Sequence, residues 1–231
     1  MMLRKWEELP DFMRTEAVRP YYDILSNKKG TLAAKRAFDL VMASFLLIFL
    51  SPVMLVIAVA VKLDSKGEIF FRQERVTQYG KIFKIYKFRT MVKDADKLGS
   101  QVTTKNDARV TRIGRFLRKY RLDETAQLFN VITGDMSFVG TRPEAVPYAQ
   151  KYTKEMMATL LLPAGITSEA SIRYKDEDIL LDVADDIDKI YVEDVLPEKM
   201  KYNYQSLRNF SFIKDILTML KTILVVLGKT Y

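Results

Sequence analysis

The longest hydrophobic stretch of the chain lies in its first third. The 22 residues from Leu40 to Val61 include no charged side chain. A stretch of about 18 to 20 apolar residues is enough for a membrane-embedded helix. It begins too far from the N-terminus for a secretory signal peptide, and it lacks a small-residue cleavage site. The pattern therefore predicts a membrane helix over residues 34–62, with a buried helix of a soluble protein as the alternative.

The middle of this predicted helix contains Pro52, which indicates a break. A proline inside a helix removes one backbone hydrogen bond, and the hydroxyl of Ser51 can bond back to a freed carbonyl. Basic residues favour the cytoplasmic side of a membrane, and here they flank both ends of the stretch. A helix that breaks at Ser51–Pro52 and returns to the same face satisfies both ends, so we favour a re-entrant helix over a span. The flanking cations are Lys28, Lys29, Lys35 and Arg36 on one side, and Lys62, Lys66, Arg72 and Arg75 on the other.

A second apolar pattern occupies the C-terminal end. Apolar residues recur there at every third or fourth position, and Lys214, Asp215 and Lys221 lie off the stripe. Such a stripe is typical of an amphipathic helix that lies in the membrane interface, and equally of a helix packed on a core. The stripe consists of Ile213, Ile216, Leu217, Leu220, Ile223, Leu224 and Leu227.

Residues 68–90 have a pattern typical of strands. Two runs, EIFFRQERV and KIFKIYKFRTM, are rich in β-branched and aromatic residues, and QYG supplies a turn between them. They predict a β-hairpin. Because side chains alternate along a strand, Lys87 and Arg89 share one face, where two cations could hold a diphosphate; a solvated edge strand is the alternative. The polar residues 91–110 that follow predict a loop or lid over a site.

The composition limits the chemistry that this chain can perform. It has 231 residues, no cysteine and no histidine. These absences exclude disulfides, the usual zinc ligands, cysteine nucleophiles and histidine-dependent triads. The net charge is 37 − 29 = +8, and residues 62–121 alone contain 17 basic and 6 acidic residues. Such a basic block attracts polyanions, which include nucleic acid, anionic lipid and phosphorylated substrates.

Two adjacent carboxylates, Asp123 and Glu124, follow the basic block. Asp123 is expected to be the N-cap of a helix that ends near Thr133–Gly134, and capping alone would explain the pair. The surrounding arginines indicate instead magnesium-assisted phosphoryl chemistry, in which one carboxylate attacks phosphorus and the other binds the ion. These arginines are Arg112, Arg115, Arg118, Arg121 and Arg142.

The order and spacing of the apolar stretch, the two strand-like runs and the carboxylate motif resemble those of the bacterial sugar transferases. These are monotopic polyprenyl-phosphate phosphoglycosyl transferases that start capsule, exopolysaccharide and glycan synthesis. The resemblance covers about residues 34–228. It consists of KRAFDL, the break at Ser51–Pro52, IFFRQERV, FKIYKFRTM, RLDETAQLFNVITGDMSFVGTRPE, PAGIT and a final LPEKMKYN…FIKDILTMLKT. It implies transfer of a sugar-1-phosphate from a UDP-sugar to undecaprenyl phosphate, with release of UMP.

The resemblance also implies a role for each candidate residue. Asp123 matches the nucleophile, which forms a covalent phospho-sugar intermediate, and Glu124 matches the carboxylate that binds Mg²⁺. Ser51 and Pro52 match the break that makes the membrane helix re-entrant. The cations at matching substrate-binding positions are Lys87 and Arg89 near the phosphates, Arg118 at the active site, Arg142 on a phosphate and Arg173 on the nucleotide-sugar side.

The expected fold is α/β and helix-rich, with a re-entrant membrane helix, a small β-hairpin or sheet and amphipathic interfacial helices. Its segments are an N-terminal extension (1–33), the re-entrant helix (34–62) and a catalytic domain on the cytoplasmic face of the membrane (63–231). The expected partners are a UDP-sugar, undecaprenyl phosphate and the lipid bilayer, without nucleic acid. The sugar, formation of a homo-oligomer and the role of residues 1–33 stay open.

Two non-catalytic alternatives make different predictions. A binder that holds nucleic acid or anionic lipid through residues 62–121 would depend steeply on salt and would tolerate changes at Asp123. A membrane scaffold would also tolerate Asp123→Asn. Neither alternative requires arginines around two adjacent carboxylates, so we favour the enzyme.

Overall fold

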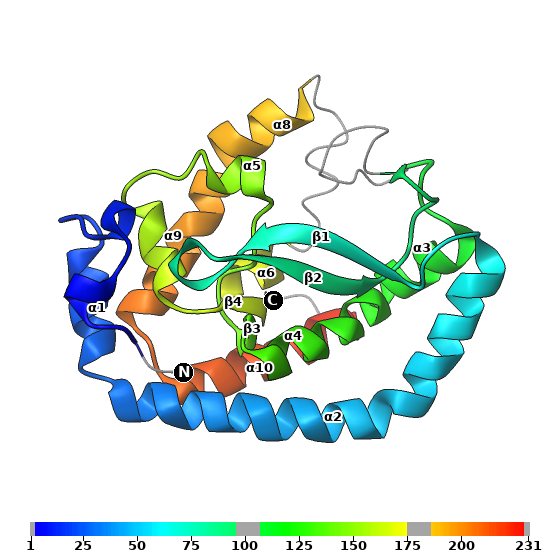
Figure 1. Cartoon of the computed structure of the whole chain (residues 1–231), viewed down its shortest axis with the longest axis horizontal. Helices are drawn as coiled ribbons and strands as arrows, with labels where there is room; N and C mark the ends of the chain where they lie inside the picture. The colour runs from blue at the N-terminus through cyan, green and yellow to red at the C-terminus, as the bar shows by residue number, and fades with distance from the viewer. Residues whose placement is uncertain (1–2, 96–106, 175–185, 229–231) are drawn as a thin grey trace.

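The computed structural model describes residues 3–95, 107–174 and 186–228. Within these ranges the chain is helix-rich with two small sheets, as the sequence predicted. The centre of the predicted lid, residues 96–106, lies outside the described residues. The helices in Figure 1 are α1 (Arg19–Ser26), α2 (Lys29–Asp64), α3 (Arg112–Lys119), α4 (Leu128–Thr133), α5 (Val146–Ala149), α6 (Glu169–Arg173), α8 (Ile187–Ile190), α9 (Leu196–Arg208) and α10 (Phe212–Val226). Shorter 3₁₀ or π turns include η3 (Gln78–Gly80), η5 (Leu122–Gln127), η6 (Met156–Leu161) and η7 (Tyr191–Val195).

The apolar stretch forms one long helix, α2, with Pro52 in its interior. Figure 1 shows α2 running along the bottom of the molecule, bending sharply in its central part and continuing up the right-hand side. The Ser51 hydroxyl donates a hydrogen bond of 2.8 Å to the carbonyl of Ile48, which is the carbonyl that Pro52 cannot bind. This confirms the predicted back-bond. The helix continues through the bend, so the expected break is a kink and not an interruption of the helix.

Protein covers little of α2. It is the one helix among the described residues that is long and apolar enough to cross a membrane, and 17% of its most apolar window is buried. Phe45, Ile48 and Phe49 are exposed, Ile48 by 76%. A helix in the core of a soluble protein would bury such side chains, so that alternative does not fit the structure.

Two small sheets lie against this helix. β1 (Phe70–Val76) and β2 (Ile82–Phe88) form the predicted antiparallel hairpin, in which Phe71 lies opposite Lys87. β3 (Met136–Val139) and β4 (Ala164–Thr167) pair in parallel. One face of β2, with Phe83 and Ile85, packs into a hydrophobic cluster that includes Leu46 and Leu50 of α2. The hairpin is therefore fixed to the membrane-helix candidate on its inner face.

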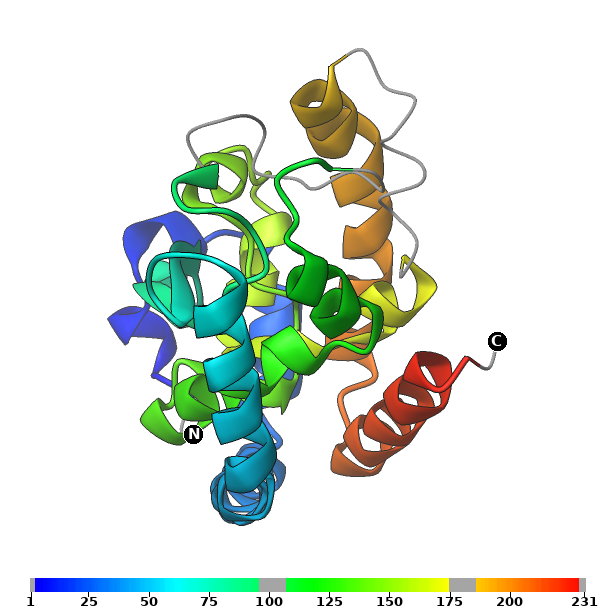
Figure 2. The ribbon, with the colours of Figure 1, turned by 90° about the vertical axis from the view of Figure 1, so that its right-hand side faces the viewer.

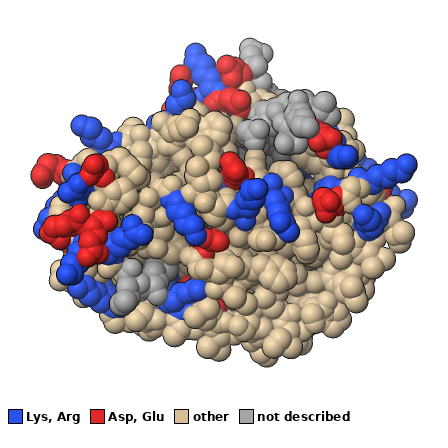
Figure 3. Space-filling view, viewed as in Figure 1, with Lys and Arg blue, Asp and Glu red and all other residues tan. Residues whose placement is uncertain are grey.

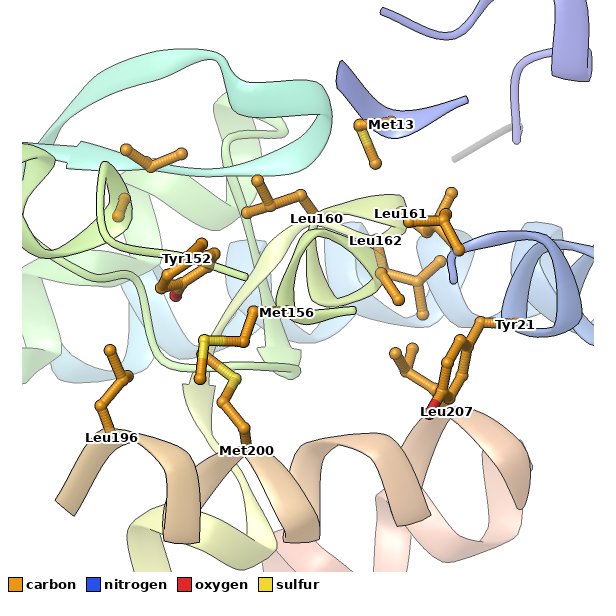
Figure 4. Packing of buried hydrophobic residues seen from close by; sticks show 14 of the residues in the cluster. Met13, Tyr21, Tyr152, Met156, Leu160, Leu161, Leu162, Leu196, Met200 and Leu207 are labelled. Atoms are coloured by element: carbon orange, nitrogen blue, oxygen red, sulfur yellow. The ribbon is translucent and has the colours of Figure 1, made fainter. Parts of the chain in front are cut away.

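The main hydrophobic core joins the N-terminal segment to η6 and α9. In Figure 4, Met13 lies near Leu160 and Leu161 of η6, and Tyr21 lies beside Leu207 of α9. Met13 and Tyr21 are almost fully buried. The described part of residues 1–33, whose role was open, therefore belongs to the folded core.

α10 lies beside the first limb of α2 (Figure 2), and an ion pair of 2.6 Å between Lys35 Nζ and Asp215 Oδ2 links the two helices. Thr218 is the one buried residue of α10. The alternative that its apolar stripe packs on the core is therefore wrong. Figure 3 shows that the lower right edge of the molecule, along α2, is nearly free of charged side chains. The large exposed side chains of the stripe are Ile213, Leu217, Leu220, Ile223 and Leu227.

Candidate active site

One large cleft collects most of the candidate residues. Its volume among the described residues is about 1880 Å³. Sites for a single small molecule usually occupy roughly 300 to 1,000 Å³, so this cleft has room for more than one substrate. Of the candidates, Lys87, Arg89, Arg118, Asp123, Glu124 and Arg142 line the cleft, and Arg173 does not.

The carboxylate pair Asp123–Glu124 lies on η5, immediately after α3. α3 approaches the end of the hairpin so closely that a Cβ atom on Gly114 would lie 2.0 Å from the carbonyl oxygen of Thr90. Arg121 then turns the chain with a φ of 55°, which costs a residue other than glycine about 1 to 2 kcal/mol. Strained residues of this kind concentrate at functional sites, and this one lies two residues before Asp123.

The helix expected to begin at Asp123 begins differently. Arg121 holds the N-cap position, Asp123 lies inside a 3₁₀ turn, and regular α-helix starts only at Leu128. The predicted end is confirmed, because Gly134 closes α4 with a φ of 89°. The side chain of Asp123 is therefore not used as a cap.

Glu124 is held by three cations. Its Oε1 atom lies 2.7 Å from Arg142 Nη2, 3.0 Å from Lys87 Nζ and 3.8 Å from Arg121 Nη1. Burial alone would raise the pKa of Glu124, but Arg142, Lys87 and Arg121 outweigh it and hold the pKa well below its usual range. Burial also lowers the pKa of Lys87, against the attraction of Glu124. Glu124 is therefore ionised throughout the physiological range of pH.

Asp123 is in the opposite electrostatic situation. Its Oδ1 atom is buried and has no hydrogen-bond partner among the described residues. Burial and the neighbouring Glu124 raise the pKa of Asp123, while Lys87 and Arg118 act in the other direction. Buried polar atoms in folded proteins are nearly always paired, so an unpaired one at the wall of a cleft is a functional candidate.

Comparison with known proteins identifies the family to which this site belongs. The family described as bacterial sugar transferase matches residues 30–229, a range that includes both carboxylates and every candidate cation. The chain belongs to the bacterial sugar transferase family. The resemblance drawn from the sequence motifs is therefore confirmed.

The relatives of this sugar transferase differ in the sugar that their names give. A protein of Aeromonas hydrophila, named as a UDP-N-acetylgalactosamine-undecaprenyl-phosphate N-acetylgalactosaminephosphotransferase, is 35% identical over 84% of this chain and 43% of its own length. A UDP-glucose:undecaprenyl-phosphate glucose-1-phosphate transferase of Escherichia coli is 45% identical over 67% of this chain and 34% of its own length. An undecaprenyl-phosphate galactose phosphotransferase of Salmonella typhimurium is 32% identical over 87% of this chain and 42% of its own length. The chain thus spans less than half the length of each of these relatives.

Two candidate cations of the sugar transferase are placed by contacts with the protein itself. Arg118 Nε donates a hydrogen bond of 2.8 Å to Thr90 Oγ1, and burial lowers the pKa of Arg118 against the attraction of Asp123. The guanidinium of Arg89 donates to the carbonyls of Ser65 at 2.6 Å and Lys66 at 2.9 Å, just after α2 ends. Arg89 therefore has a structural role, and its expected contact with a phosphate stays a prediction.

Arg173, the last candidate cation, lies on α6. Its guanidinium lies 5.2 Å from the centre of the Tyr202 ring, and the side chain is exposed. The structure does not bring Arg173 to the cleft. Its expected role on the nucleotide-sugar side also stays a prediction.

A group of polar residues in the cleft was not proposed as part of the site from the sequence. The Tyr191 hydroxyl lies 2.9 Å from both carboxylate oxygens of Glu144, and Lys199 Nζ donates to this hydroxyl at 3.1 Å. Arg75 Nη1 donates to the carbonyl of Pro143 at 3.2 Å. Glu144, Lys199 and Arg75 lie in the quoted motifs RPE, LPEKMKYN and IFFRQERV, so the motifs were the available signal. Together these contacts fix the turn that carries Arg142, the closest cation to Glu124.

The described residues fit a magnesium ion that binds together with a phosphorylated substrate. They contain no group of three or more acidic side chains that could enclose a metal by themselves. Mg²⁺ usually takes one or two carboxylates and completes its octahedron with phosphate and water oxygens. Glu124, which is ionised and lines the cleft beside Asp123, supplies such a carboxylate.

Proposed function

We propose that this chain transfers a sugar-1-phosphate from a UDP-sugar to undecaprenyl phosphate and releases UMP, as the first membrane step in the synthesis of a polysaccharide or glycoconjugate. The observation that carries the proposal is the buried, unpaired oxygen of Asp123 beside an ionised Glu124 in a cleft lined with cations. The names of three relatives include undecaprenyl phosphate, which supports the same acceptor here.

The reaction would proceed in two displacements through Asp123. In the first, a carboxylate oxygen of Asp123 attacks the phosphorus that carries the sugar. The bond from this phosphorus to the oxygen bridging the two phosphates breaks, and UMP leaves with that oxygen. In the second, an oxygen of undecaprenyl phosphate attacks the same phosphorus, and the bond to Asp123 breaks. Both leaving groups are anions, so neither step requires an imidazole acid, in agreement with a chain that contains no histidine.

The cations at the cleft would stabilise the charge on the transferring phosphate. Lys87 and Arg142 contact Glu124 and line the same cleft, where they can bind the phosphate oxygens as the substrate enters. Arg118, fixed by Thr90, would act beside Asp123. Glu124 would hold Mg²⁺, which supplies additional positive charge for the diphosphate when it is bound.

The proposal places α2 in the membrane as a re-entrant helix, with the cleft on the cytoplasmic face. The kink at Pro52 supports this placement, because it lies within the uncharged stretch Leu40–Val61 and directs the two limbs of α2 away from a straight span. The cations before and after the helix support it as well. The exposed apolar stripe of α10, which lies beside the first limb of α2, would rest in the same membrane interface.

The test is UMP release from a panel of UDP-sugars, with undecaprenyl phosphate and Mg²⁺, by the wild type, Asp123→Asn and Asp23→Asn. Asp23 pairs with Arg19 on the surface, so its variant controls for the loss of a carboxylate. The wild type and Asp23→Asn are expected to use one sugar, and Asp123→Asn to be slower by more than about a thousandfold.

A second measurement tests the covalent step. Without acceptor, the mass of the wild type should increase by one sugar phosphate, and that of Asp123→Asn should not. Equal rates for the wild type and Asp123→Asn would contradict the role of Asp123. Turnover without any adduct during rapid sampling would favour direct transfer between the two substrates.

A further inference from the structure

The walls of the cleft have two different chemical characters. Part of the wall comes from α3 and the turn after it, and carries Arg115, Lys119 and Arg121. Another part is apolar and comes from four elements, α2, β3, β4 and α10. Its residues are Leu46, Leu50, Phe138, Ile166, Ile223 and Val226. A cleft with one cationic and one apolar part is complementary to an amphiphile with an anionic head.

The apolar part is a continuous surface that begins close to the carboxylate pair. Leu46, Leu50, Phe138 and Ile166 pack against one hydrophobic cluster, which includes Leu128. Leu128 directly follows η5 and also lines the cleft, so this surface starts within five residues of Asp123. A hydrogen bond of 2.7 Å between Thr167 Oγ1 and Thr222 Oγ1 holds α10 against β4 at the same place.

The same surface continues to the outside of the protein. Ile223 lines the cleft and is also 56% exposed as a member of the outer stripe of α10. Leu46 and Leu50 belong to the part of α2 that carries no charge between Leu40 and Val61. Ile223, Leu46 and Leu50 therefore join the apolar wall of the cleft to the surface that we propose to face the membrane.

The polar end of the cleft lies elsewhere in the fold. It is formed by Glu144, Tyr191 and Lys199, from the start of α9 and the segments before α5 and α9. In Figure 1, α5 and α8 lie above the hairpin, α10 and the first limb of α2 lie below it, and the second limb of α2 rises beside its right-hand end. The apolar part and the polar end of the cleft therefore come from different elements of the fold.

We infer that the isoprenoid chain of the acceptor lies along the apolar surface between α2 and α10, with its phosphate beside Arg121 and Asp123. This inference rests on the proposed function and adds the site at which the second substrate binds. The nucleoside of the donor would then occupy the polar end, and the acceptor phosphate would attack phosphorus from the position that the phosphate of UMP has vacated, opposite Asp123.

A photo-crosslinking experiment tests the location without requiring turnover. The full chain is placed in nanodiscs with a polyprenyl phosphate that carries a diazirine in its isoprenoid chain, and the labelled peptides are mapped. We expect labels around residues 222–227 and 46–50, removed by excess undecaprenyl phosphate and not by phosphatidylglycerol. Equal competition by phosphatidylglycerol would overturn the inference, because the groove would then hold ordinary bilayer lipid.

A pair of matched variants on α10 tests the consequence for the reaction. Val226 lines the cleft, whereas Leu220 is 53% exposed and is not part of the lining. Val226→Glu should raise the KM for undecaprenyl phosphate by about tenfold or more and leave acceptor-independent UMP release within about twofold of the wild type. Leu220→Glu, assayed in detergent, should change neither the KM for undecaprenyl phosphate nor acceptor-independent UMP release. Val226→Leu should retain the wild-type KM.

The two proposals fail in distinguishable ways. Equal KM values for Val226→Glu and Leu220→Glu would overturn the acceptor site while the enzyme remains active. A parallel loss of acceptor-independent UMP release in Val226→Glu would show general damage to the site and also contradict the inference. No UMP release by the wild type would contradict the proposed function, and the crosslinks would still report where the polyprenyl chain binds.

Discussion

Replacing Arg142 by methionine tests how strongly the cations control Glu124. Arg142 Nη2 makes the shortest contact with Glu124 Oε1, 2.7 Å, and is the leading cation among those that lower the pKa of Glu124. A hydrogen bond to a charged group contributes about 1.5 to 3 kcal/mol. Because about 1.4 kcal/mol corresponds to tenfold in rate, kcat/KM for UMP release should fall by roughly 10- to 100-fold.

The same substitution should also shift the response to acid. The pKa of Glu124 is lower in the folded protein than in the unfolded chain, so ionised Glu124 stabilises the fold above its unfolded pKa, and this stability is lost as the pH falls through the folded pKa. Without Arg142 the folded pKa rises. The acid limb of activity should then move to a higher pH, and the stability that ionised Glu124 contributes should be smaller and should be lost completely at a higher pH.

The assay is a pH profile of acceptor-independent UMP release together with thermal unfolding at each pH, for the wild type, Arg142→Met and Arg121→Met. Arg121 is the matched control, because it lies 3.8 Å from the same oxygen and is 44% exposed. Its loss should have a smaller effect on rate and on the acid limb. An unchanged acid limb in Arg142→Met, or an equal shift in both variants, would refute the reasoning.

Two further substitutions test the support of the site. Gly114→Ala places a Cβ atom 2.0 Å from the carbonyl oxygen of Thr90, so it should lower the free energy of unfolding by about 1 to 3 kcal/mol and slow UMP release. Gly30→Ala is the control in thermal unfolding, because a Cβ atom on Gly30 would have no neighbouring atom within 4 Å. Arg89→Met should lower the free energy of unfolding by about 1 to 3 kcal/mol, because the carbonyls that follow α2 lose their hydrogen-bond donor. It should leave the KM for the UDP-sugar within about twofold of the wild-type value. A KM raised tenfold or more would instead make Arg89 a phosphate ligand.

The elements that depend on local signals could be predicted from the sequence. The uncharged length of α2 and the hydrogen-bonding deficit of Pro52 are properties of neighbouring residues, and so is the turn of the hairpin. The burial of Met13 and Tyr21 is different, because it depends on contacts with η6 and α9, which are more than 100 residues away in the chain. No periodicity within residues 1–33 distinguishes such packing from contact with a membrane.

The site could be predicted as far as its motifs extended. The pair Asp123–Glu124 could be found from the arginines that surround it in the sequence. That Lys87 and Arg142 both bind the same oxygen of Glu124 could not be predicted, because the fold brings these distant residues together. The side-chain alternation that put Arg89 beside Lys87 holds only within a strand, and β2 ends at Phe88. Just beyond that point, the backbone N–H of Arg89 still donates to the carbonyl of Ile69, but its guanidinium binds the backbone that follows α2.

The division of roles between the two carboxylates follows from their unequal surroundings. Adjacent carboxylates repel each other, so a site that concentrates its cations on one of them leaves the other with a raised pKa. Here three cations converge on Glu124, while burial and the charge of Glu124 raise the pKa of Asp123. A carboxylate that is poorly solvated and unpaired is the more reactive nucleophile, and one that stays ionised is the better metal ligand. The arrangement therefore supports the proposal that Asp123 attacks phosphorus and that Glu124 binds the metal. The exchange of the two side chains, Asp123→Glu with Glu124→Asp, should abolish the adduct although both charges remain.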